Sequence, residues 1–143
     1  MKILIINGPN LNLLGKRDQE IYGSIAFEDH LEELKKTFTE HEIHYFQSNI
    51  EGEIVDELQK ADKNKDAVIL NPAAYSHTSI AIADAVSAIN TNIPVIEVHI
   101  SNIHAREGYR KKSITAEKCN GMICGLGLES YRTALRHLLE RNN

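Results

Sequence analysis

The chain has 143 residues, and 16 Lys and Arg against 20 Asp and Glu give it a formal net charge of -4. This length suits a single domain, residues 1–143, with an ordinary hydrophobic core. A negative net charge argues against the basic surface of a nucleic-acid-binding protein. No apolar run approaches the roughly 20 residues that span a bilayer, and the first run is too short for a signal peptide. We therefore expect a cytoplasmic protein with no nucleic-acid or membrane partner.

The N-terminal stretch combines a short strand pattern with a long polar connection. Ile3 to Ile6 is a continuous apolar run that ends at Asn7-Gly8-Pro9-Asn10, which predicts a buried strand. The next helical pattern begins only near Phe27, whereas a connection from strand to helix usually has about 2–6 residues. Too few apolar residues lie between them to pack as helix or strand. The connection is therefore predicted to be a binding loop or lid.

The rest of the chain alternates between helix and strand patterns. Apolar residues at three- and four-residue spacing predict helices around residues 27–38, 54–58, 80–89 and 128–139. Short apolar runs predict strands at 42–48, 67–70, 94–98 and 120–124. The third helix follows His77-Thr78-Ser79, where a hydroxyl side chain is placed to cap it. This alternation predicts an α/β fold, a flavodoxin-like doubly wound sandwich with a five-stranded parallel sheet.

Two features of the C-terminal third favour structural roles. Cys119 and Cys124 do not form a C-x-x-C pair and are expected to be reduced, inert thiols in a buried strand. Gly125-Leu126-Gly127 lacks the third glycine or the Lys-Ser/Thr pair of a phosphate-binding loop. A plain turn is the better interpretation of this segment.

Polar groups gather where three of the predicted strands end. The carboxyl ends of parallel strands meet at one edge of a sheet, where ligands bind near the switch in strand order. Strand periodicity places the carboxylate and imidazole of the fourth strand on the same side. A neighbouring carboxylate holds histidine in one tautomer and favours its charged form, which suits a general acid. The residues concerned are Asn10, Asn71, His77, Glu97, His99 and Ser101.

A metal site is the first alternative for this cluster, because Glu97, His99, His77 and His104 are all possible ligands. The sequence contains neither an H-x-x-x-H nor an H-E-x-x-H pair, so we expect no metal. His30, His41, His44 and His137 are expected to be surface or capping residues.

Two loops contribute ionisable residues that suit proton abstraction. Arg17 and Tyr22 lie in the N-terminal connection, and Arg106 and Arg110 lie in the polar segment after the fourth strand. Each is individually compatible with a solvated surface position. If the loops close over one pocket, guanidinium groups favour tyrosinate, which makes Tyr22 a general base. Such a pair of acid and base suits proton removal next to a carbonyl with loss of a neighbouring hydroxyl, without a cofactor.

Several separated motifs together resemble the type II 3-dehydroquinate dehydratases, from Lys2 to about Leu139. They are INGPNLNLLG at 6–15, Arg17 with Tyr22-Gly23, ILN at 69–71, HTS at 77–79, EVHISNIHAREGYR at 97–110 and GLG at 125–127. The resemblance implies dehydration of 3-dehydroquinate to 3-dehydroshikimate by anti elimination through an enolate, in the shikimate pathway. It also implies a flavodoxin-like fold, no cofactor, and a homododecamer built from trimers.

The resemblance implies a role for each matching residue. Tyr22 matches the base, Arg17 the residue that activates it, His99 the proton donor, Glu97 the residue that orients this histidine, and Asn10 the residue that holds a water near the enolate oxygen. The substrate-binding positions are matched by Asn71, His77, Ile100, Ser101 and Arg110, with Arg106 in the same motif. Asp84 matches a residue that the family contributes from a neighbouring subunit.

The chain departs from the family in the N-terminal connection, which usually reads Arg-Glu-Pro and here reads Arg17-Asp18-Gln19. Proline fixes one backbone dihedral, so its absence predicts an altered closing equilibrium of the lid.

Three alternatives stay open. The chain could be a flavodoxin-like module that binds a nucleotide or small acid without catalysis, or an assembly scaffold. An imine mechanism would need a lysine, and Lys16 alone lies near the expected site.

Overall fold

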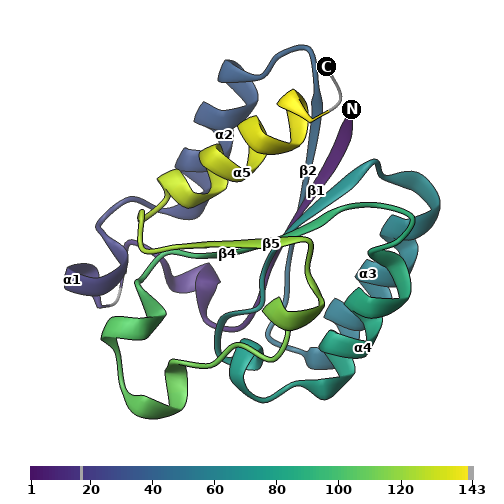
Figure 1. The fold of residues 1–143 in the computed structure, drawn as a ribbon. Coiled ribbons are helices and arrows are strands. Elements are labelled where there is room, and N and C mark those ends of the chain that lie inside the picture. The colour runs from purple at the N-terminus through teal and green to yellow at the C-terminus, as the bar shows by residue number, and fades with distance from the viewer. Residues whose placement is uncertain (17, 142–143) are drawn as a thin grey trace.

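A computed structural model describes residues 1–16 and 18–141, and its centre is an all-parallel sheet (Figure 1). The strands lie in the order β2-β1-β3-β4-β5. This is the flavodoxin-like order, so the predicted fold class is confirmed. The strands are β1 (Lys2–Asn7), β2 (Glu42–Gln47), β3 (Ala67–Asn71), β4 (Val95–His99) and β5 (Gly121–Cys124).

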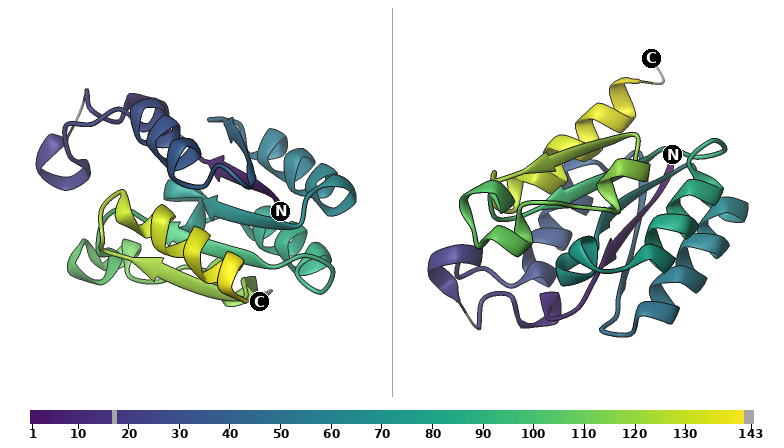
Figure 2. Two further views of the ribbon diagram at one scale, coloured as in Figure 1. Left: turned by 90° about the horizontal axis from the view of Figure 1, so that it is seen from above. Right: turned by 60° about the horizontal axis from the view of Figure 1, so that its bottom comes forward.

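Helices cover both faces of the sheet, as Figures 1 and 2 show. On one face lie α2 (Phe27–Thr37) and α5 (Glu129–Glu140), and on the other lie α3 (Glu51–Asn64) and α4 (Ile80–Ile89). Alternate residues of β1 explain why its sequence is apolar throughout. Ile3 and Ile5 pack with α2 and α5, whereas Leu4 and Ile6 pack with α3 and α4. A strand that is buried on both faces cannot show a polar side.

Connections at the carboxyl ends of the strands carry short helical turns. The N-terminal connection contains a 3-10 turn at Leu11–Leu13 and the one-turn helix α1 (Gln19–Tyr22). The sequence had predicted a loop without helix here. A single helical turn can form because local backbone hydrogen bonds close it, and it needs no apolar face to pack against the core. Figure 2 shows α1 and the segment after β4 at the same end of the sheet. Two long connections therefore meet there.

The start of α4 follows the capping prediction. The Ser79 hydroxyl accepts a hydrogen bond from the Ile82 amide at 2.9 Å, which satisfies one free N–H of the first turn. Thr78 is the residue after a preceding 3-10 turn and lies outside the helix. The end of α2 also comes earlier than its apolar pattern, because Phe38 has left helical geometry.

The prediction for Cys119 was wrong in one respect. It lies after the 3-10 turn Ala116–Lys118 and before β5, outside the strand, and both cysteines are only partly buried. Burial, with Glu97 close by, raises the pKa of the Cys119 thiol, which keeps it protonated.

Within residues 1–16 and 18–141, no helix has both the length and the apolar character needed to cross a membrane.

Candidate active site

A cavity of about 150 Å³ opens at the carboxyl ends of β1, β3 and β4. The N-terminal connection forms one wall and the segment after β4 forms another. The sheet edge therefore brings together most of the residues predicted for the site. Those that line the cavity are Asn10, Tyr22, Asn71, His77, His99, Ile100, Ser101, Arg106 and Arg110.

Glu97 and His99 lie on the same side of β4, as strand periodicity predicted. The His99 Nε2 atom is 2.6 Å from the Glu97 Oε1 atom, and the two residues are 5 % and 0 % exposed. An ionised carboxylate only accepts hydrogen bonds, so Nε2 carries the hydrogen. The other ring nitrogen, Nδ1, is therefore the one that can serve a ligand. Glu97 itself lies behind the ring and does not line the cavity.

Two hydroxyls hold the Glu97 carboxylate from the other side. Ser113 Oγ donates to Oε1 and Thr115 Oγ1 donates to Oε2, each at 2.6 Å. Both residues are buried, and neither was predicted to belong to the site. Charge-assisted hydrogen bonds of this length stabilise an ionised carboxylate. The Glu97 side chain is thus fixed by three hydrogen-bond donors.

Tyr22, at the end of α1, is contacted by a guanidinium group from the opposite wall. Arg106 Nη1 donates to the Tyr22 hydroxyl at 2.9 Å, and the Arg106 Cζ atom is 5.6 Å from the ring centroid. This gives Arg106 a specific contact, which its motif alone had not indicated. Arg17, predicted to activate the same tyrosine, lies outside the described residues.

A buried tyrosine fixes the orientation of Asn71. The Asn71 amide donates to the Tyr131 hydroxyl at 2.7 Å, and that hydroxyl donates to Asn7 Oδ1 at 2.8 Å. Asn71 Oδ1 accepts from the Ala73 amide at 3.2 Å. The amide is thereby held in one orientation, with a second N–H available on the cavity side. Burial raises the pKa of Tyr131, so its hydroxyl stays protonated and can donate.

The connection after β1 packs closely against the end of β3. The Gly8 amide donates to the Asn71 carbonyl at 2.8 Å, and a Cβ atom at position 8 would lie 2.5 Å from the Pro72 carbonyl oxygen. Only glycine fits at this approach. Asn10 follows with φ 67°, and its amide donates to Asn49 Oδ1 at 2.9 Å. The chain thus turns sharply where Asn10 reaches the cavity.

His77 lies against His99 on the cavity wall. The two rings stack with centroids 6.5 Å apart and planes 21° apart. His77 Nδ1 is 2.7 Å from the Lys112 carbonyl oxygen, which can only accept, so Nδ1 carries the hydrogen. The Nε2 atom of His77 is then an acceptor for a ligand hydroxyl.

A carboxylate outside the pocket holds Arg110. The Arg110 Nε atom is 3.1 Å from Glu107 Oε2, and Arg106 Nε is 3.7 Å from the same oxygen. The Glu107 backbone N–H, and then these two guanidinium groups, lower the pKa of the Glu107 carboxyl. Both arginines are therefore tied to one exposed anion beside the cavity.

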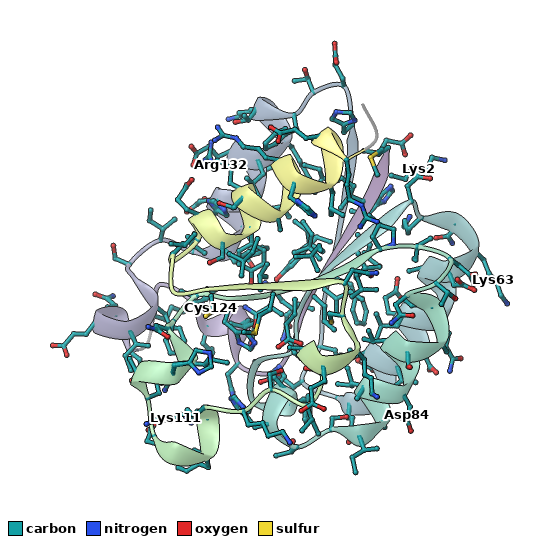
Figure 3. The ribbon with its side chains drawn as sticks, in the orientation of Figure 1. Lys2, Lys63, Asp84, Lys111, Cys124 and Arg132 are labelled. Carbon is teal, nitrogen blue, oxygen red and sulfur yellow. The ribbon has the colours of Figure 1, made fainter. Side chains whose placement is uncertain are left out.

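Asp84 does not line this cavity. It is exposed on α4, and Figure 3 shows it on the opposite side of the sheet from Arg132. A role for Asp84 in a neighbouring subunit's site stays a prediction.

The segment Gly125–Gly127 makes a turn in which both glycine amides are hydrogen-bonded to the protein. The Gly125 and Gly127 amides donate to the carbonyls of His99 and Ile100 at 3.3 and 3.0 Å. The prediction of a plain turn is confirmed. Among the described residues, no three His, Cys, Asp or Glu side chains are grouped to hold a metal ion.

Comparison with known families gives this geometry a context. The family model described as Dehydroquinase class II matches residues 1–139. The chain belongs to the class II dehydroquinase family.

Curated relatives within this family are similar over almost the whole chain. A "3-dehydroquinate dehydratase" of Caldicellulosiruptor bescii is 54% identical over 142 residues, covering 97% of each chain. A protein of the same name from Clostridium beijerinckii is 54% identical over 141 residues, covering 96% of this chain and 95% of its own.

Solved class II dehydroquinases have the same fold. The type II dehydroquinase of Butyrivibrio crossotus has a TM-score of 0.92 and 45% identity, with 97% of both chains covered. The enzyme of Propionibacterium acnes has a TM-score of 0.91 and 40% identity, with 96% of this chain and 94% of that chain covered.

In this class II dehydroquinase the N-terminal connection has an unusual backbone at the position where the sequence departs from the family pattern. Asp18 adopts φ 43° and ψ 45°, just before Gln19 begins α1. A residue before proline is disfavoured in helical geometry. Gln19 also donates from Nε2 to the Gly15 carbonyl at 3.0 Å, a bond that proline cannot make. The altered closing equilibrium stays a prediction, and these contacts supply a local reason for it.

Sequence patterns missed the contacts of Ser113, Thr115 and Tyr131 with residues of the candidate site. For Ser113 and Thr115 the available signal was a pair of hydroxyl residues, separated by one position, in the segment before the last strand. Tyr131 appeared only as an apolar member of a helix face, and its hydroxyl was not considered. Each contact joins segments far apart in the sequence.

Proposed function

We propose that this chain dehydrates 3-dehydroquinate to 3-dehydroshikimate through an enolate, as a hydro-lyase of the shikimate pathway. One observation carries the proposal: Tyr22 and His99 line the same cavity, with Arg106 on the tyrosine and Glu97 on the histidine. A base next to a cation and an acid next to an anion are suited to complementary proton transfers. Membership of the class II dehydroquinase family supports the choice of substrate.

Tyr22 acts as the base. Its oxygen, as tyrosinate, takes a proton from the carbon beside the substrate ketone, and the electron pair of that C–H bond forms the enolate. Arg106 Nη1, 2.9 Å from this oxygen, stabilises the negative charge that tyrosine carries before the transfer. Arg17 is proposed to contribute a second positive charge. Asn10, at the cavity wall, holds a water that donates to the enolate oxygen.

His99 acts as the acid. The enolate re-forms the carbonyl and a carbon–carbon double bond as the neighbouring C–O bond breaks. His99 gives a proton from Nδ1 to the departing hydroxyl, which leaves as water. Glu97, bound to Nε2, stabilises the imidazolium before this step and holds the ring in place. The proton taken by Tyr22 returns to His99 to close the cycle.

Polar groups around the acid and base are proposed to orient the substrate. The Asn71 amide and His77 Nε2 are placed for substrate hydroxyls, while Ser101 and the Ile100 backbone are placed for the carboxylate. Arg110 adds a positive charge at the mouth of the cavity. We further propose that the chain assembles as a homododecamer of trimers, with Asp84 completing a neighbour's site.

An imine mechanism is disfavoured by the composition of the cavity wall. Among the described residues that line it, none is a lysine. Borohydride added with substrate is therefore expected to leave the activity intact.

The test is the appearance of enone absorbance when purified protein meets 3-dehydroquinate. Tyr22→Phe and His99→Ala are expected to lower kcat by about 100-fold or more, as loss of a general base or acid does. Tyr45→Phe is the matched control, since Tyr45 is a partly buried tyrosine outside the cavity wall. Turnover that survives Tyr22→Phe would reject the base. Absence of turnover in the parent protein would reject the proposed reaction.

A further inference from the structure

We propose that Ser113 and Thr115 are positioning residues for proton transfer, acting together as a hydroxyl pair that holds the Glu97 carboxylate against His99. This inference rests on the proposed role of His99 as the acid. The hydroxyl pair lies on the segment between the cavity wall and β5, 16 and 18 residues from Glu97 in sequence. Neither residue of the pair lines the cavity.

The first step concerns which donor binds each oxygen of the Glu97 carboxylate. Thr115 donates to Oε2, whereas Ser113 and His99 share Oε1, all at 2.6 Å. With both oxygens held, the carboxylate cannot rotate about its terminal torsion, which is otherwise a soft one. The direction of the Oε1 lone pairs then fixes the plane of the imidazole.

The second step is the hydrogen-bond inventory of the pair itself. Ser113 Oγ accepts from the Ala116 amide at 3.1 Å, and the two hydroxyl oxygens are 3.2 Å apart. Because an amide already supplies a hydrogen to Ser113 Oγ, the hydroxyl hydrogen is free to point at Glu97. The Ile114 amide donates to the Ser76 carbonyl at 2.8 Å, which anchors the segment between the two hydroxyls.

The third step is the absence of a buried cation from this set of contacts. Among the described residues, the hydrogen-bond partners of the Glu97 carboxylate are His99, the hydroxyl pair and the Cys119 thiol, whose Sγ is 3.9 Å from Oε2. A carboxylate that is 0 % exposed needs hydrogen bonds to compensate for lost water. The hydroxyl pair supplies these without a fixed positive charge, so the proton on His99 remains the positive charge that Glu97 stabilises.

A loss of the pair should therefore slow hydroxyl departure and leave proton abstraction by Tyr22 intact. Thr115→Val keeps the shape of the side chain and removes the hydroxyl alone. We expect kcat to fall about 10-fold, the effect of losing roughly one charge-assisted hydrogen bond, with KM unchanged within twofold. Thr115→Ser, which retains the hydroxyl, should restore most of kcat.

Isotope exchange distinguishes positioning from general damage to the site. If the second step is slowed, the enolate returns to substrate before the hydroxyl leaves. Substrate recovered from D2O after partial turnover by Thr115→Val should therefore carry deuterium at the abstracted position, at a higher level than with the parent protein. A variant that had merely lost site structure would show slower turnover without this enrichment.

Ser76→Ala is the matched control. Ser76 is a fully buried serine beside the same segment, and its hydroxyl has no hydrogen-bond partner among the described residues. The Ser76→Ala variant should have the same kcat as the parent protein and the same level of deuterium in recovered substrate. If Thr115→Val does not fold, Ser113→Ala provides the same measurement at Oε1.

The proposal is overturned if Thr115→Val keeps kcat within twofold, if Thr115→Ser is as slow as Thr115→Val, or if slower turnover comes without deuterium enrichment. These results would leave the proposed function standing as long as Tyr22→Phe and His99→Ala still lower kcat by about 100-fold or more. Failure of the proposed function itself would show as no turnover in the parent.

Discussion

Arg106 donates a hydrogen bond of 2.9 Å to the Tyr22 hydroxyl across the candidate active site, although 84 residues separate them in sequence. The contact joins α1, on the N-terminal connection, to the segment after β4. A residue of the N-terminal connection and a residue of the opposite wall are thereby linked through the atom proposed to accept the substrate proton.

Arg106→Gln should lower kcat by about 10- to 100-fold, because a hydrogen bond to a charged group contributes about 1.5–3 kcal/mol. Glutamine keeps a donor and removes the positive charge that favours tyrosinate. Steady-state kinetics with 3-dehydroquinate measures the effect. Arg132→Gln is the control. The Arg132 Nη2 atom is 2.9 Å from Glu33 Oε1, and neither of these two residues lines the cavity. Equal kcat in Arg106→Gln and the parent would contradict the role of this guanidinium.

Tyr131→Phe should destabilise the protein by about 1–3 kcal/mol, because the buried Asn71 Nδ2 donor and the buried Asn7 Oδ1 acceptor both lose the Tyr131 hydroxyl. KM should rise as well, since the Asn71 amide loses its fixed orientation. Urea unfolding and steady-state kinetics measure the two effects. Tyr45→Phe is the matched control, because the Tyr45 hydroxyl accepts a long bond of 3.4 Å from Asn7 and no other hydrogen bond from the described part of the chain. If Tyr45→Phe loses as much unfolding free energy as Tyr131→Phe, the short hydrogen bonds of the Tyr131 hydroxyl are not the cause of the destabilisation.

His30 makes stability fall on the acid side of neutrality. The ring is 4 % exposed, and burial, with Arg132 nearby, lowers its pKa below the ordinary value of 6.5. The unfolded chain takes up a proton as pH falls through 6.5 while the folded ring stays neutral. Stability is therefore lost below pH 6.5, by at most about 1.4 kcal/mol per pH unit from this group, until the folded ring also titrates.

His30→Gln should reduce the loss of unfolding free energy that occurs as the pH falls below 6.5. The measurement is the free energy of unfolding in urea at pH 7.5 and at pH 5.5, for the parent and the variant. The difference between the two pH values should be smaller in His30→Gln, whatever its stability at pH 7.5. Equal differences in both proteins would show that the buried ring does not contribute.

Two glycines should respond to alanine in opposite directions. Gly8→Ala forces a Cβ against the Pro72 carbonyl, so we expect a loss of about 1–3 kcal/mol in unfolding free energy and lower activity. Gly52 lies in α3 with open space around a Cβ, so Gly52→Ala should stabilise by about 0.5–1 kcal/mol. Thermal and urea unfolding measure both. If Gly8→Ala leaves the unfolding free energy unchanged, the connection after β1 can move away from Pro72 without an energetic cost.

The sequence was sufficient for features that depend on local pattern. The apolar runs of β1, β3 and β4 and the helical spacing between them predicted the parallel sheet, because burial on both faces removes polar residues from a strand. Two-residue spacing predicted that Glu97 and His99 share a side of β4. The rule that parallel strands end at one edge then brought Asn10, Asn71 and His77 to the same cavity.

Features that depend on distant parts of the chain were beyond these patterns. No periodicity marks Ser113 or Thr115, because their segment is irregular and acts through contacts with β4. The hydroxyl of Tyr131 reaches Asn7 across 124 residues. Cys119 was misplaced because a turn interrupts the segment before β5, and Arg17 and Asp84 keep their predicted roles untested.

The hydrogen-bonded link from Asn7 through Tyr131 to Asn71 also sets an order on events during synthesis. Strands β1 and β3 can pair once residue 71 has left the ribosome, but the hydroxyl that orients Asn71 arrives some sixty residues later, on α5. Until then the Asn71 Nδ2 donor and the Asn7 Oδ1 acceptor lack the Tyr131 hydroxyl as a partner. The hydrogen bonds that orient Asn71 at the candidate site can therefore form only after the chain that builds the sheet has been synthesised.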